Sequence, residues 1–389
     1  MILPMHSAQL YSWAAFVCDA TAGVGCLYIL ICAACVLRFP DQGKARREGE
    51  PPLTILKPLH GYEPELARRL SNFCAQHYGA PIQIVCGIAD ERDAAAPSVK
   101  QLMSQRTAAD VELVVDGHDH GSNRKISNLA NMLPHARHEI LVFSDSDIEI
   151  DRDCLGKVAR RLEQEGVGAV TCLYHGVAGP GVWSRQAALT INSHLLPSMV
   201  LALTFKLARP CFGSLIAIRR GMLARIGGFE SFADCLADDY AIGTAIRAAG
   251  KEVAVSSFTV GHFCYEKSWR DLLAHELRAA QTIRNLRPIS YCGTFMVHPF
   301  PMALLAASFS NASPLLLAAL ALTCRLLLCR CIEHRFGAAQ QAYWLIPFND
   351  LFSFGVYVLS FVQPRVSWRG TSYQITPDGH LVVERDGTP

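Results

Sequence analysis

The sequence is short of charged residues, and this shortage limits what the protein can be. Charged side chains make up 18% of its 389 residues, whereas an average soluble domain has roughly 25%. Hydrophobic residues account for 51%, and the formal net charge is only +2. Nucleic-acid binding requires a concentrated basic surface, so we expect no nucleic-acid partner.

Internal repeats, low-complexity stretches and zinc-type cysteine spacings are also lacking. The fifteen cysteines are scattered along the chain. Cys32 and Cys35 form a C-x-x-C pattern inside an apolar run, where cysteine packs as a small hydrophobic side chain. Scattered thiols of this kind are typical of a reducing compartment, which favours a cytosolic location for the polar part of the chain.

The N-terminal apolar run, residues 11–38, is long enough to cross roughly 30 Å of hydrocarbon. No basic segment precedes it and no clear cleavage site ends it, so an uncleaved anchor is favoured over a signal peptide. Lys44, Arg46 and Arg47 follow. By the positive-inside bias these residues predict that the next segment faces the cytosol.

Residues 52–290 alternate between β-rich runs and amphipathic helical runs. The expected strands lie at 54–59, 82–90, 111–117, 139–147 and 166–174, with helices such as 64–76 and 98–106 between them. This alternation predicts an α/β fold with a Rossmann-like, mostly parallel sheet and helices on both faces. Ligands of such sheets bind beyond the carboxyl ends of the strands.

The C-terminal part is apolar again and predicts about two further spans, near 298–323 and 342–362. The apolar run continues through 326–331, so a re-entrant hairpin plus one span remains an alternative. We therefore expect four parts. They are a transmembrane anchor (1–40), a cytosolic domain (41–290), a membrane region (291–364) and a short polar tail (365–389).

Acidic residues follow the strands where chemistry is expected. Asp145 and Asp147 end the fourth strand as a D-x-D pair, whose carboxylates leave the strand on one side. Such a pair can hold Mg or Mn, which would neutralise a diphosphate. A solvated turn at the end of the strand would show the same D-x-D pattern. Asp90 ends the second strand, where an Asx turn is the alternative to a binding role.

Two adjacent carboxylates, Asp238 and Asp239, precede an amphipathic helix. They suit a helix N-terminus, but their proximity also predicts a raised pKa for one of them, as a general base requires.

Further along, Ser268 and Asp271 resemble a capping box that opens another helix. Its polar face would carry His275 and Arg278 and could simply be the solvated side, or it could bind a diphosphate. His194 lies in an apolar setting, where a buried structural histidine is the ordinary interpretation.

Together these motifs resemble the family 2/family 21 group of inverting glycosyltransferases with a GT-A fold, in particular the ceramide glucosyltransferase branch. The resemblance extends from K-P-L-x-G at Lys57 through about residue 290. Within that branch, NRKISNLANMLPHARHEILVFSDSDI, RPCFGSLIAIRR, GGFESFADCLADDYAIG and HELRAAQTIR are similar to bacterial hopanoid-pathway members, which add N-acetylglucosamine to bacteriohopanetetrol.

The resemblance implies roles for individual residues. Asp239 would be the catalytic base, with Asp145 and Asp147 at the metal. The UDP-sugar would be bound by a wider set, namely Asp90, Asp145, Asp147, Arg278 and Lys57. His194, Asp238 and His275 would lie on the acceptor side. The family signature (Q/R)-x-x-R-W is altered here, because His275 replaces its first residue and Ala279 replaces its tryptophan.

The implied protein is a multi-pass enzyme of the bacterial inner membrane with a cytosolic catalytic domain. It would move a sugar from a UDP-sugar to the hydroxyl of a membrane lipid, using a divalent metal. A ceramide glucosyltransferase, or a non-catalytic membrane protein that binds a nucleotide-sugar, are the alternatives. A processive polysaccharide synthase would need more spans than the sequence offers.

Overall fold

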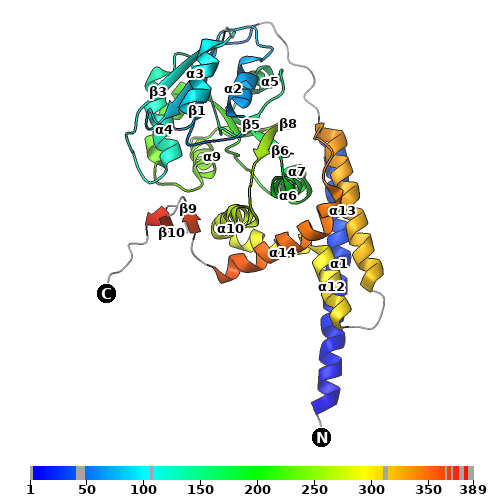
Figure 1. Cartoon of the computed structure of the whole chain (residues 1–389). Coiled ribbons are helices and arrows are strands. Elements are labelled where there is room, and N and C mark those ends of the chain that lie inside the picture. The colour runs from blue at the N-terminus through cyan, green and yellow to red at the C-terminus, as the bar shows by residue number, and fades with distance from the viewer. Residues whose placement is uncertain are drawn as a thin grey trace, which may run out of the picture.

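The computed structural model describes residues 3–40, 49–105, 108–309, 314–363, 366–368, 371–375 and 381–383. Lys44, Arg46 and Arg47, on which the predicted cytosolic placement depends, lie outside these residues. Four parts can be distinguished in Figure 1. An α/β domain lies above an upright helix bundle, further helices lie across the junction between them, and a small sheet lies near the C-terminus.

The α/β domain is built on one eight-stranded sheet with the order β3-β2-β1-β4-β7-β6-β8-β5. Its strands are β1 (Leu53–Pro58), β2 (Ile82–Ile88), β3 (Asp110–Val115), β4 (Ile140–Ser144), β5 (Ile148–Glu149), β6 (Val167–Ala178), β7 (Leu215–Arg219) and β8 (Glu252–Cys264). Its helices are α2 (Leu66–Cys74), α3 (Ala96–Ser104), α4 (Arg124–Met132), α5 (Cys154–Leu162), α8 (Arg220–Arg225) and α9 (Asp238–Ala248), with short 3-10 turns η1 (Leu133–His135) and η3 (Glu230–Phe232).

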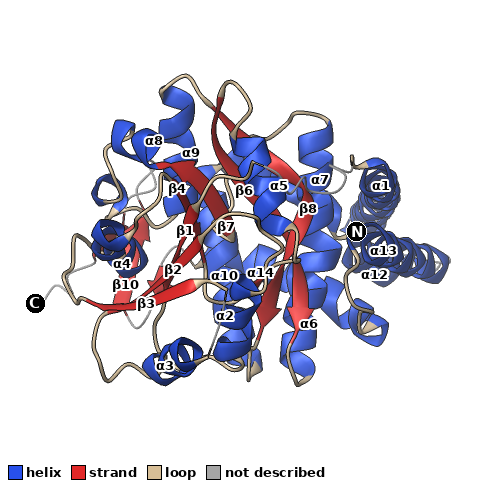
Figure 2. Ribbon diagram, turned by 90° about the horizontal axis from the view of Figure 1, so that it is seen from above, coloured by secondary structure: helices blue, strands red, loops and turns tan. Residues whose placement is uncertain are grey.

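The predicted α/β class is confirmed, and the N-terminal half of the sheet is the expected parallel one. Strands β1, β2 and β4 are buried along almost their whole length, as the near-continuous apolar runs of parallel strands require. In the view of Figure 2, helices cover this half of the sheet.

The other half of the sheet differs from the expectation. Strand β7 pairs antiparallel with both β4 and β6, and β6 pairs parallel with β8. The run near 166–174 is therefore a strand, but it is separated from the parallel half by β7. Neither β7 nor β8 was among the strands expected from the sequence.

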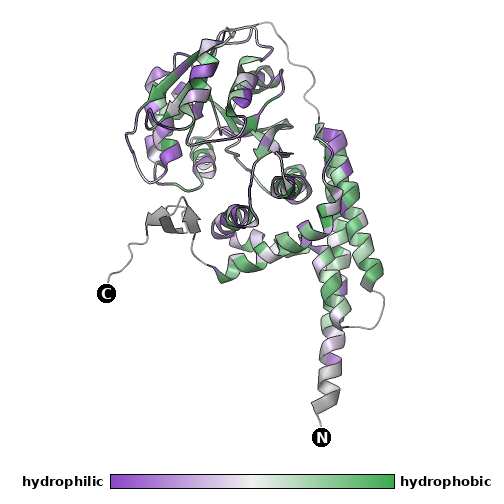
Figure 3. Ribbon diagram, in the orientation of Figure 1, coloured by the Kyte–Doolittle hydropathy of each residue, from purple (hydrophilic) through white to green (hydrophobic). Residues whose placement is uncertain are grey.

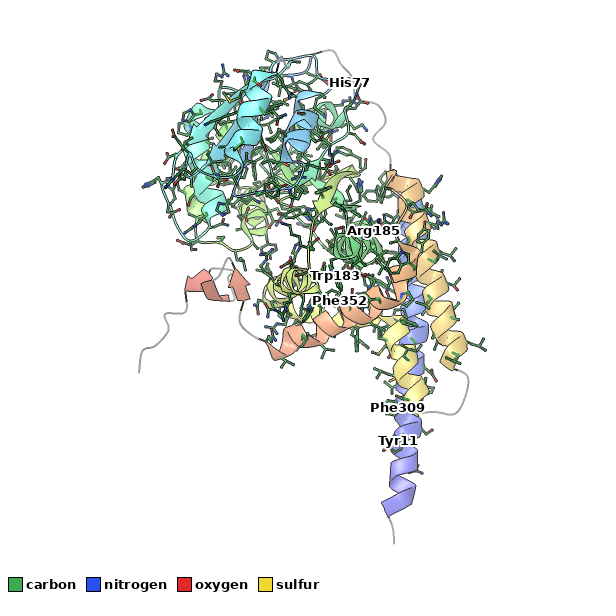
Figure 4. The ribbon with its side chains drawn as sticks, in the orientation of Figure 1. Tyr11, His77, Trp183, Arg185, Phe309 and Phe352 are labelled. Atoms are coloured by element: carbon green, nitrogen blue, oxygen red, sulfur yellow. The ribbon has the colours of Figure 1, made fainter. Side chains whose placement is uncertain are left out.

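The upright bundle consists of α1 (Leu3–Arg38), α12 (Pro299–Phe309) and α13 (Pro314–Phe336). These three helices and α7 share one buried apolar cluster, which includes Ile29, Val200, Ala303 and Leu328. In Figure 3 the ribbons of these helices are mostly green, the colour of hydrophobic residues. At the far end, the rings of Tyr11 and Phe309 stack with centroids 6.2 Å apart (Figure 4).

A second set of helices lies across the upright bundle in both Figure 1 and Figure 2. It contains α6 (Val182–Thr190), η2 (Ile191–Leu195), α7 (Leu196–Thr204), α10 (Trp269–Leu286), α11 (Pro288–Gly293), η4 (Thr294–Val297), η5 (Tyr343–Leu345) and α14 (Ile346–Val362). Trp183 of α6 and Phe352 of α14 belong to one apolar cluster at this junction (Figure 4).

Four of the described helical stretches are long and apolar enough to cross a membrane, namely Tyr11–Arg38, Val182–Thr204, Leu315–Phe336 and Tyr343–Val362. The bent pair Pro288–Val297 and Pro299–Phe309, with a 67° angle, would add a fifth if it were one broken span. Two stretches agree with expected spans, but Val182–Thr204 lies inside the range 41–290 that was expected to be a soluble domain. The run expected at 298–323 is divided between α12 and α13.

Arg325 of α13 connects three of these elements. Its guanidinium donates to the carbonyl oxygen of Ser193 at 2.7 Å and to that of Val297 at 2.6 Å. In each case the residue four positions on is a proline, Pro197 or Pro301, which has no N–H to offer that carbonyl. Arg325 thus satisfies two carbonyls that the prolines leave without a helical donor.

The charge of Arg325 is balanced by Asp350 of α14. Nε of Arg325 lies 3.0 Å from Oδ1 of Asp350, and the two side chains are 1% and 0% exposed. Nε2 of His194 lies 3.4 Å from the same oxygen. This buried ion pair fixes the start of α14 against α13.

Replacing either member of this pair should destabilise the protein. Removing one partner of a buried ion pair leaves an uncompensated charge and costs about 3–5 kcal/mol. Arg325→Met and Asp350→Asn should each lower the unfolding temperature of the detergent-solubilised protein. The double variant should lose less than the sum of the two, because it buries no unpaired charge. Strictly additive losses would contradict this account.

Candidate active site

A cavity of about 520 Å³ opens at the carboxyl ends of β1, β2, β3 and β4. It is lined mainly by polar residues from the loops that follow these strands and from α4. They are Pro58, Leu59, His60, Glu63, Ala89, Asp116, Gly117, His118, Asp119, Arg124, Lys125, Ser127, Asn128, Asn131, Asp145, Ser146, Asp147, Tyr265 and Arg278. This is the edge of the sheet where the sequence predicted a ligand site.

Lys57 holds the D-x-D loop through hydrogen bonds to Ser144 and Asp145. Nζ of Lys57 donates to Oγ of Ser144 at 3.2 Å and to the backbone oxygen of Asp145 at 2.8 Å. The side chain is 1% exposed, and its ammonium lies 3.6 Å from the centre of the Phe73 ring. Burial lowers the pKa of Lys57 to about 7. Lys57 lies outside the cavity lining, behind the loop that it holds.

Lys125 joins the D-x-D loop to the acidic pair at the start of α9. Its Nζ lies 2.7 Å from Oδ1 of Asp145 and 3.2 Å from Oδ2 of Asp238. Burial alone would lower the pKa of Lys125, but the two carboxylates raise it above its usual value. Lys125 is positioned by α4, whose N-cap Asn123 accepts hydrogen bonds from the backbone N–H groups of Lys125 and Ile126.

Asp239 is held by backbone donors next to this ion pair. Its Oδ2 accepts from the N–H of Gly213 at 2.8 Å, and its Oδ1 accepts from the N–H of Tyr240 at 2.7 Å. Burial, followed by the charge of Asp238, raises the pKa of Asp239 to about 6. The pair therefore contains one carboxyl group with a raised pKa, as its sequence predicted.

Gly213 brings Asp239 and Asp145 close together. A Cβ atom at this position would lie 3.4 Å from Oδ2 of Asp239, 3.7 Å from Oδ2 of Asp145 and 3.3 Å from Nζ of Lys125. The two carboxylates therefore face the same small space, and a side chain at residue 213 would fill part of it.

Asp147 has an oxygen that suits a metal ion. Its Oδ1 is buried without a hydrogen bond and lies 3.5 Å from Nδ1 of His262. Among the described residues, no group of three or more His, Cys, Asp or Glu side chains could hold a metal by itself. The carboxylates of Asp145 and Asp147 still fit a hard cation that takes its remaining oxygen ligands from outside the protein.

The other predicted residues are distributed unevenly. Arg278 of α10 lines the cavity. His275 lies one turn away and contacts Oε1 of Glu266 at 2.9 Å instead. Ser268 accepts from the N–H of Asp271 and caps α10, as its sequence predicted.

Asp90 and His194 are not among the cavity-lining residues. The carboxylate of Asp90 is exposed and accepts from the backbone N–H and the guanidinium of Arg92. His194 lies in η2 beside Asp350. The cavity and the buried cluster around Arg325 are thus two separate polar regions.

Several cavity residues were missed by the sequence analysis. Arg124, Asn128 and Asn131 all line the cavity, and their spacing of four and three residues places them on one face of α4. That spacing was the available signal. Asp116 and His118 follow β3, whose acidic end was not considered.

Comparison with known proteins gives a family match. The model of glycosyl transferase family 21 matches residues 17–381. Ceramide glucosyltransferase 1 of Caenorhabditis elegans is 23% identical over 209 residues, which cover 53% of this chain and 44% of that protein. Ceramide glucosyltransferase of Candida albicans is 30% identical over 107 residues, covering 25% and 20%. The chain therefore spans less than half of the length of these two relatives.

Two solved structures are also similar. The mannosyltransferase PcManGT from Pyrobaculum calidifontis, in complex with GDP-Man and Mn²⁺, is 22% identical with a TM-score of 0.49, covering 90% of this chain and 99% of that one. GalNAc-T7 with UDP, GalNAc and Mn²⁺ is 12% identical with a TM-score of 0.42, covering 62% and 51%.

The Lys125→Met variant should show a pH-dependent loss of stability. Without the ammonium, the pKa of Asp239 should rise further above 6. A carboxyl group whose pKa is raised by folding weakens the fold above that pKa, and the penalty fades as the pH falls through it. The deficit in unfolding temperature should therefore be larger at about pH 7.5 than at about pH 5.

Lys100→Met, on the exposed side of α3, is the matched control and should show little deficit at either pH. An equal deficit of Lys125→Met at both pH values would mean that Lys125 does not compensate these carboxylates.

Proposed function

Because the chain belongs to glycosyl transferase family 21, we propose that it transfers a sugar from a UDP-sugar to the hydroxyl group of a membrane lipid. The observation that carries this proposal is the arrangement around Lys125. It joins the D-x-D carboxylate Asp145 to the Asp238–Asp239 pair, in which Asp239 has a raised pKa. The proposed diphosphate site and the proposed general base would therefore lie side by side.

The donor would lie across the carboxyl ends of the parallel strands. The diphosphate fits the end of the cavity formed by Asp145, Asp147 and Arg278, because a guanidinium and a metal held by carboxylates both bind phosphate oxygens. The uracil base of the donor would then reach toward β2 and β3, where Asp116 and His118 line the cavity. Lys57 would act indirectly, by positioning the D-x-D loop.

A divalent metal, Mg or Mn, would be held by Asp145 and Asp147. When bound it would neutralise charge on the departing diphosphate. The free Oδ1 of Asp147 supports this assignment. Arg278 would add a second positive charge from α10.

Asp239 would act as the general base of a single displacement. It would take the proton of the lipid hydroxyl as that oxygen forms a bond to the anomeric carbon. The bond between the anomeric carbon and the diphosphate oxygen breaks, UDP leaves, and the configuration at the anomeric carbon inverts. Asp238 would keep its charge paired with Lys125 and raise the pKa of its neighbour.

The acceptor is proposed to be a lipid because apolar helices adjoin the site. Arg278 is carried by α10, and Nε2 of Gln281 on the same helix donates to the backbone oxygen of Gln363 just beyond α14 at 2.6 Å. Exposed apolar side chains of α14 include Phe348, Leu351 and Val362. A lipid hydroxyl at this level would need to move only a short way to the site.

The finer assignment is N-acetylglucosamine as the sugar and bacteriohopanetetrol as the acceptor, in a bacterial inner membrane with the α/β domain in the cytosol. It is supported by the sequence resemblance and by the cytosolic supply of UDP-sugars. Ceramide glucosylation is the second candidate, favoured by the ceramide glucosyltransferases among the relatives. His194 and His275 would lie on the acceptor side only if the lipid reaches between α10 and η2.

The deciding experiment supplies membranes containing the protein with UDP-glucose or UDP-N-acetylglucosamine and with ceramide or hopanoid acceptors. Lipid mass analysis should detect an N-acetylhexosaminyl hopanoid, and chelation of divalent metal should abolish it. Asp239→Asn should lower transfer by at least about 10²-fold while UDP binding stays close to wild type. Wild-type activity should fall as the pH drops through about 6, because Asp239 must be deprotonated.

The matched control is Asp238→Asn, which should cost less. Glycosylated ceramide alone would refute the hopanoid assignment. Sugar transfer that survives in Asp239→Asn would place the base elsewhere, and UDP binding without any transfer would favour a non-catalytic nucleotide-sugar-binding protein.

A second prediction concerns the residue that would bind the uracil base of UDP. Asp116 lines the cavity, and one of its carboxylate oxygens accepts from the N–H of His118, whereas Asp90 lies outside the lining and both of its oxygens accept from Arg92. Asp116→Ala should therefore weaken UDP binding by about tenfold or more, since a hydrogen bond to a charged group contributes roughly 1.5–3 kcal/mol. Asp90→Ala should weaken it less. Calorimetry with UDP and with its N3-methyl analogue measures both effects.

Methylation removes the N3–H donor, so its penalty should be large in the wild type and small in Asp116→Ala. A penalty that disappears in Asp90→Ala instead would restore Asp90 to the role that the family resemblance implied.

A further inference from the structure

We propose that an arginine surface, formed by Arg209, Arg247 and Arg287 beside the acidic pair of α9, binds the phosphate groups of anionic lipids. This inference rests on the proposed function only in that the bound lipids would surround the acceptor. It concerns residues outside the cavity, and it would fix how the α/β domain lies on the membrane.

One side of the surface is a face of α9. Tyr240, Thr244 and Arg247 are spaced by four and three residues and therefore share that face. Nη2 of Arg247 lies 3.3 Å from Oγ1 of Thr244. The guanidinium of Arg287, at the end of α10, lies 5.7 Å from the centre of the Tyr240 ring. Two arginines from different helices thus approach the same face.

Arg209 reaches this region through the segment after α7. Two residues later, Cys211 packs against Gly243 of α9. A Cβ atom added at Gly243 would lie 2.6 Å from Cβ of Cys211 and 3.2 Å from Nη1 of Arg247. This close approach places the chain that carries Arg209 beside Arg247.

The three positive charges are not neutralised within the described part of the chain. The ion pairs found there include none with Arg209, Arg247 or Arg287. Burial lowers the pKa of Arg247, and Arg209 and Arg287 lower it further, although Cys211 and Tyr240 act in the opposite direction. Nη1 of Arg247 is buried without a hydrogen bond. Clustered arginines with unused donors favour an oxyanion partner.

Exposed apolar residues next to the arginines indicate a lipid. Phe205 and Leu207, at the end of α7, are 56% and 70% exposed, and Ile289 of α11 is 88% exposed. Both helices are continuous with the apolar set, because α7 packs into the cluster shared with α1 and α11 leads through η4 into α12. Large apolar side chains beside basic ones are typical of segments that lie at a membrane surface.

The surface has a consequence for the reaction. Tyr240 directly follows Asp239, so lipid phosphates bound by Arg287 would lie close to the base. The hydroxyl of a neighbouring lipid would then be held at a fixed distance from Asp239. Electrostatic attraction to anionic lipids contributes roughly 1 kcal/mol for each basic residue near the surface.

The test compares two matched double variants of the full chain. Arg209→Gln/Arg287→Gln removes two charges from the arginine surface. Lys100→Gln/Arg152→Gln removes two exposed charges elsewhere in the α/β domain. Native mass spectrometry of each detergent-solubilised protein, supplied with equal phosphatidylglycerol and phosphatidylcholine, measures which lipid is retained. Arg247 is left unchanged because it is partly buried and its loss could disturb α9.

The wild type and the control variant should prefer phosphatidylglycerol, and Arg209→Gln/Arg287→Gln should lose about tenfold or more of that preference. In the wild type, the KM for the lipid acceptor should fall as the phosphatidylglycerol content of the vesicles rises. In Arg209→Gln/Arg287→Gln this fall should be absent, while the KM for the UDP-sugar stays unchanged. Retained preference, or an equal loss in the control, would overturn the proposal.

A rise in the UDP-sugar KM with unchanged lipid preference would mean that the arginines bind the donor diphosphate, which also overturns it. If no variant transfers sugar, the proposed function fails, but lipid retention still decides whether the arginine surface exists.

Discussion

The structure depends on one buried cation, the guanidinium of Arg325. Pro197 and Pro301 have no N–H to donate to the carbonyls four residues earlier, those of Ser193 and Val297. Arg325 donates to both, and Asp350 balances its charge. In a membrane an unsatisfied carbonyl costs several kcal/mol. One side chain of α13 therefore contacts η2, η4 and α14 at once.

That arrangement reaches the candidate site through α14 and α10. Asp350 fixes the start of α14, and the end of α14 holds α10 and α11, because Arg284 of α10 donates to the backbone oxygen of Ser360 and the hydroxyls of Tyr291 of α11 and Ser360 lie 3.0 Å apart. Arg278 lies on α10 and projects into the cavity. The apolar helices and the residues that line the cavity thus form one connected framework.

Part of the fold and of the candidate site could be predicted from the sequence, because the signals for that part lie in short stretches of the chain. Strands β1, β2 and β4 are continuous apolar runs that end in polar residues, so they and the D-x-D loop stand out without any knowledge of tertiary contacts. The raised pKa of Asp239 follows from its adjacent carboxylate and from burial. By contrast, Val182–Thr204 has only moderate hydropathy and contains His194 and polar residues. Its apolar character emerges once Asn349, Ser193 and the neighbouring polar groups satisfy one another.

The roles of Lys57, Asp90 and Lys125 could not be separated by sequence, because all three are charged residues near strand ends or helix starts. Tertiary pairing distinguishes them. Lys57 is buried with backbone and hydroxyl partners, Asp90 is exposed and bound to its neighbour Arg92, and Lys125 lies between carboxylates from two distant segments. Of the three, Lys125 is the residue that contacts both the D-x-D loop and α9. A change in charge at the diphosphate end, such as the binding of a metal or the loss of UDP, would act through Lys125 on Asp238 and so on the pKa of the adjacent Asp239. The same ammonium group that lies among three carboxylates would therefore also couple the state of the donor to the basicity of the group proposed to deprotonate the acceptor.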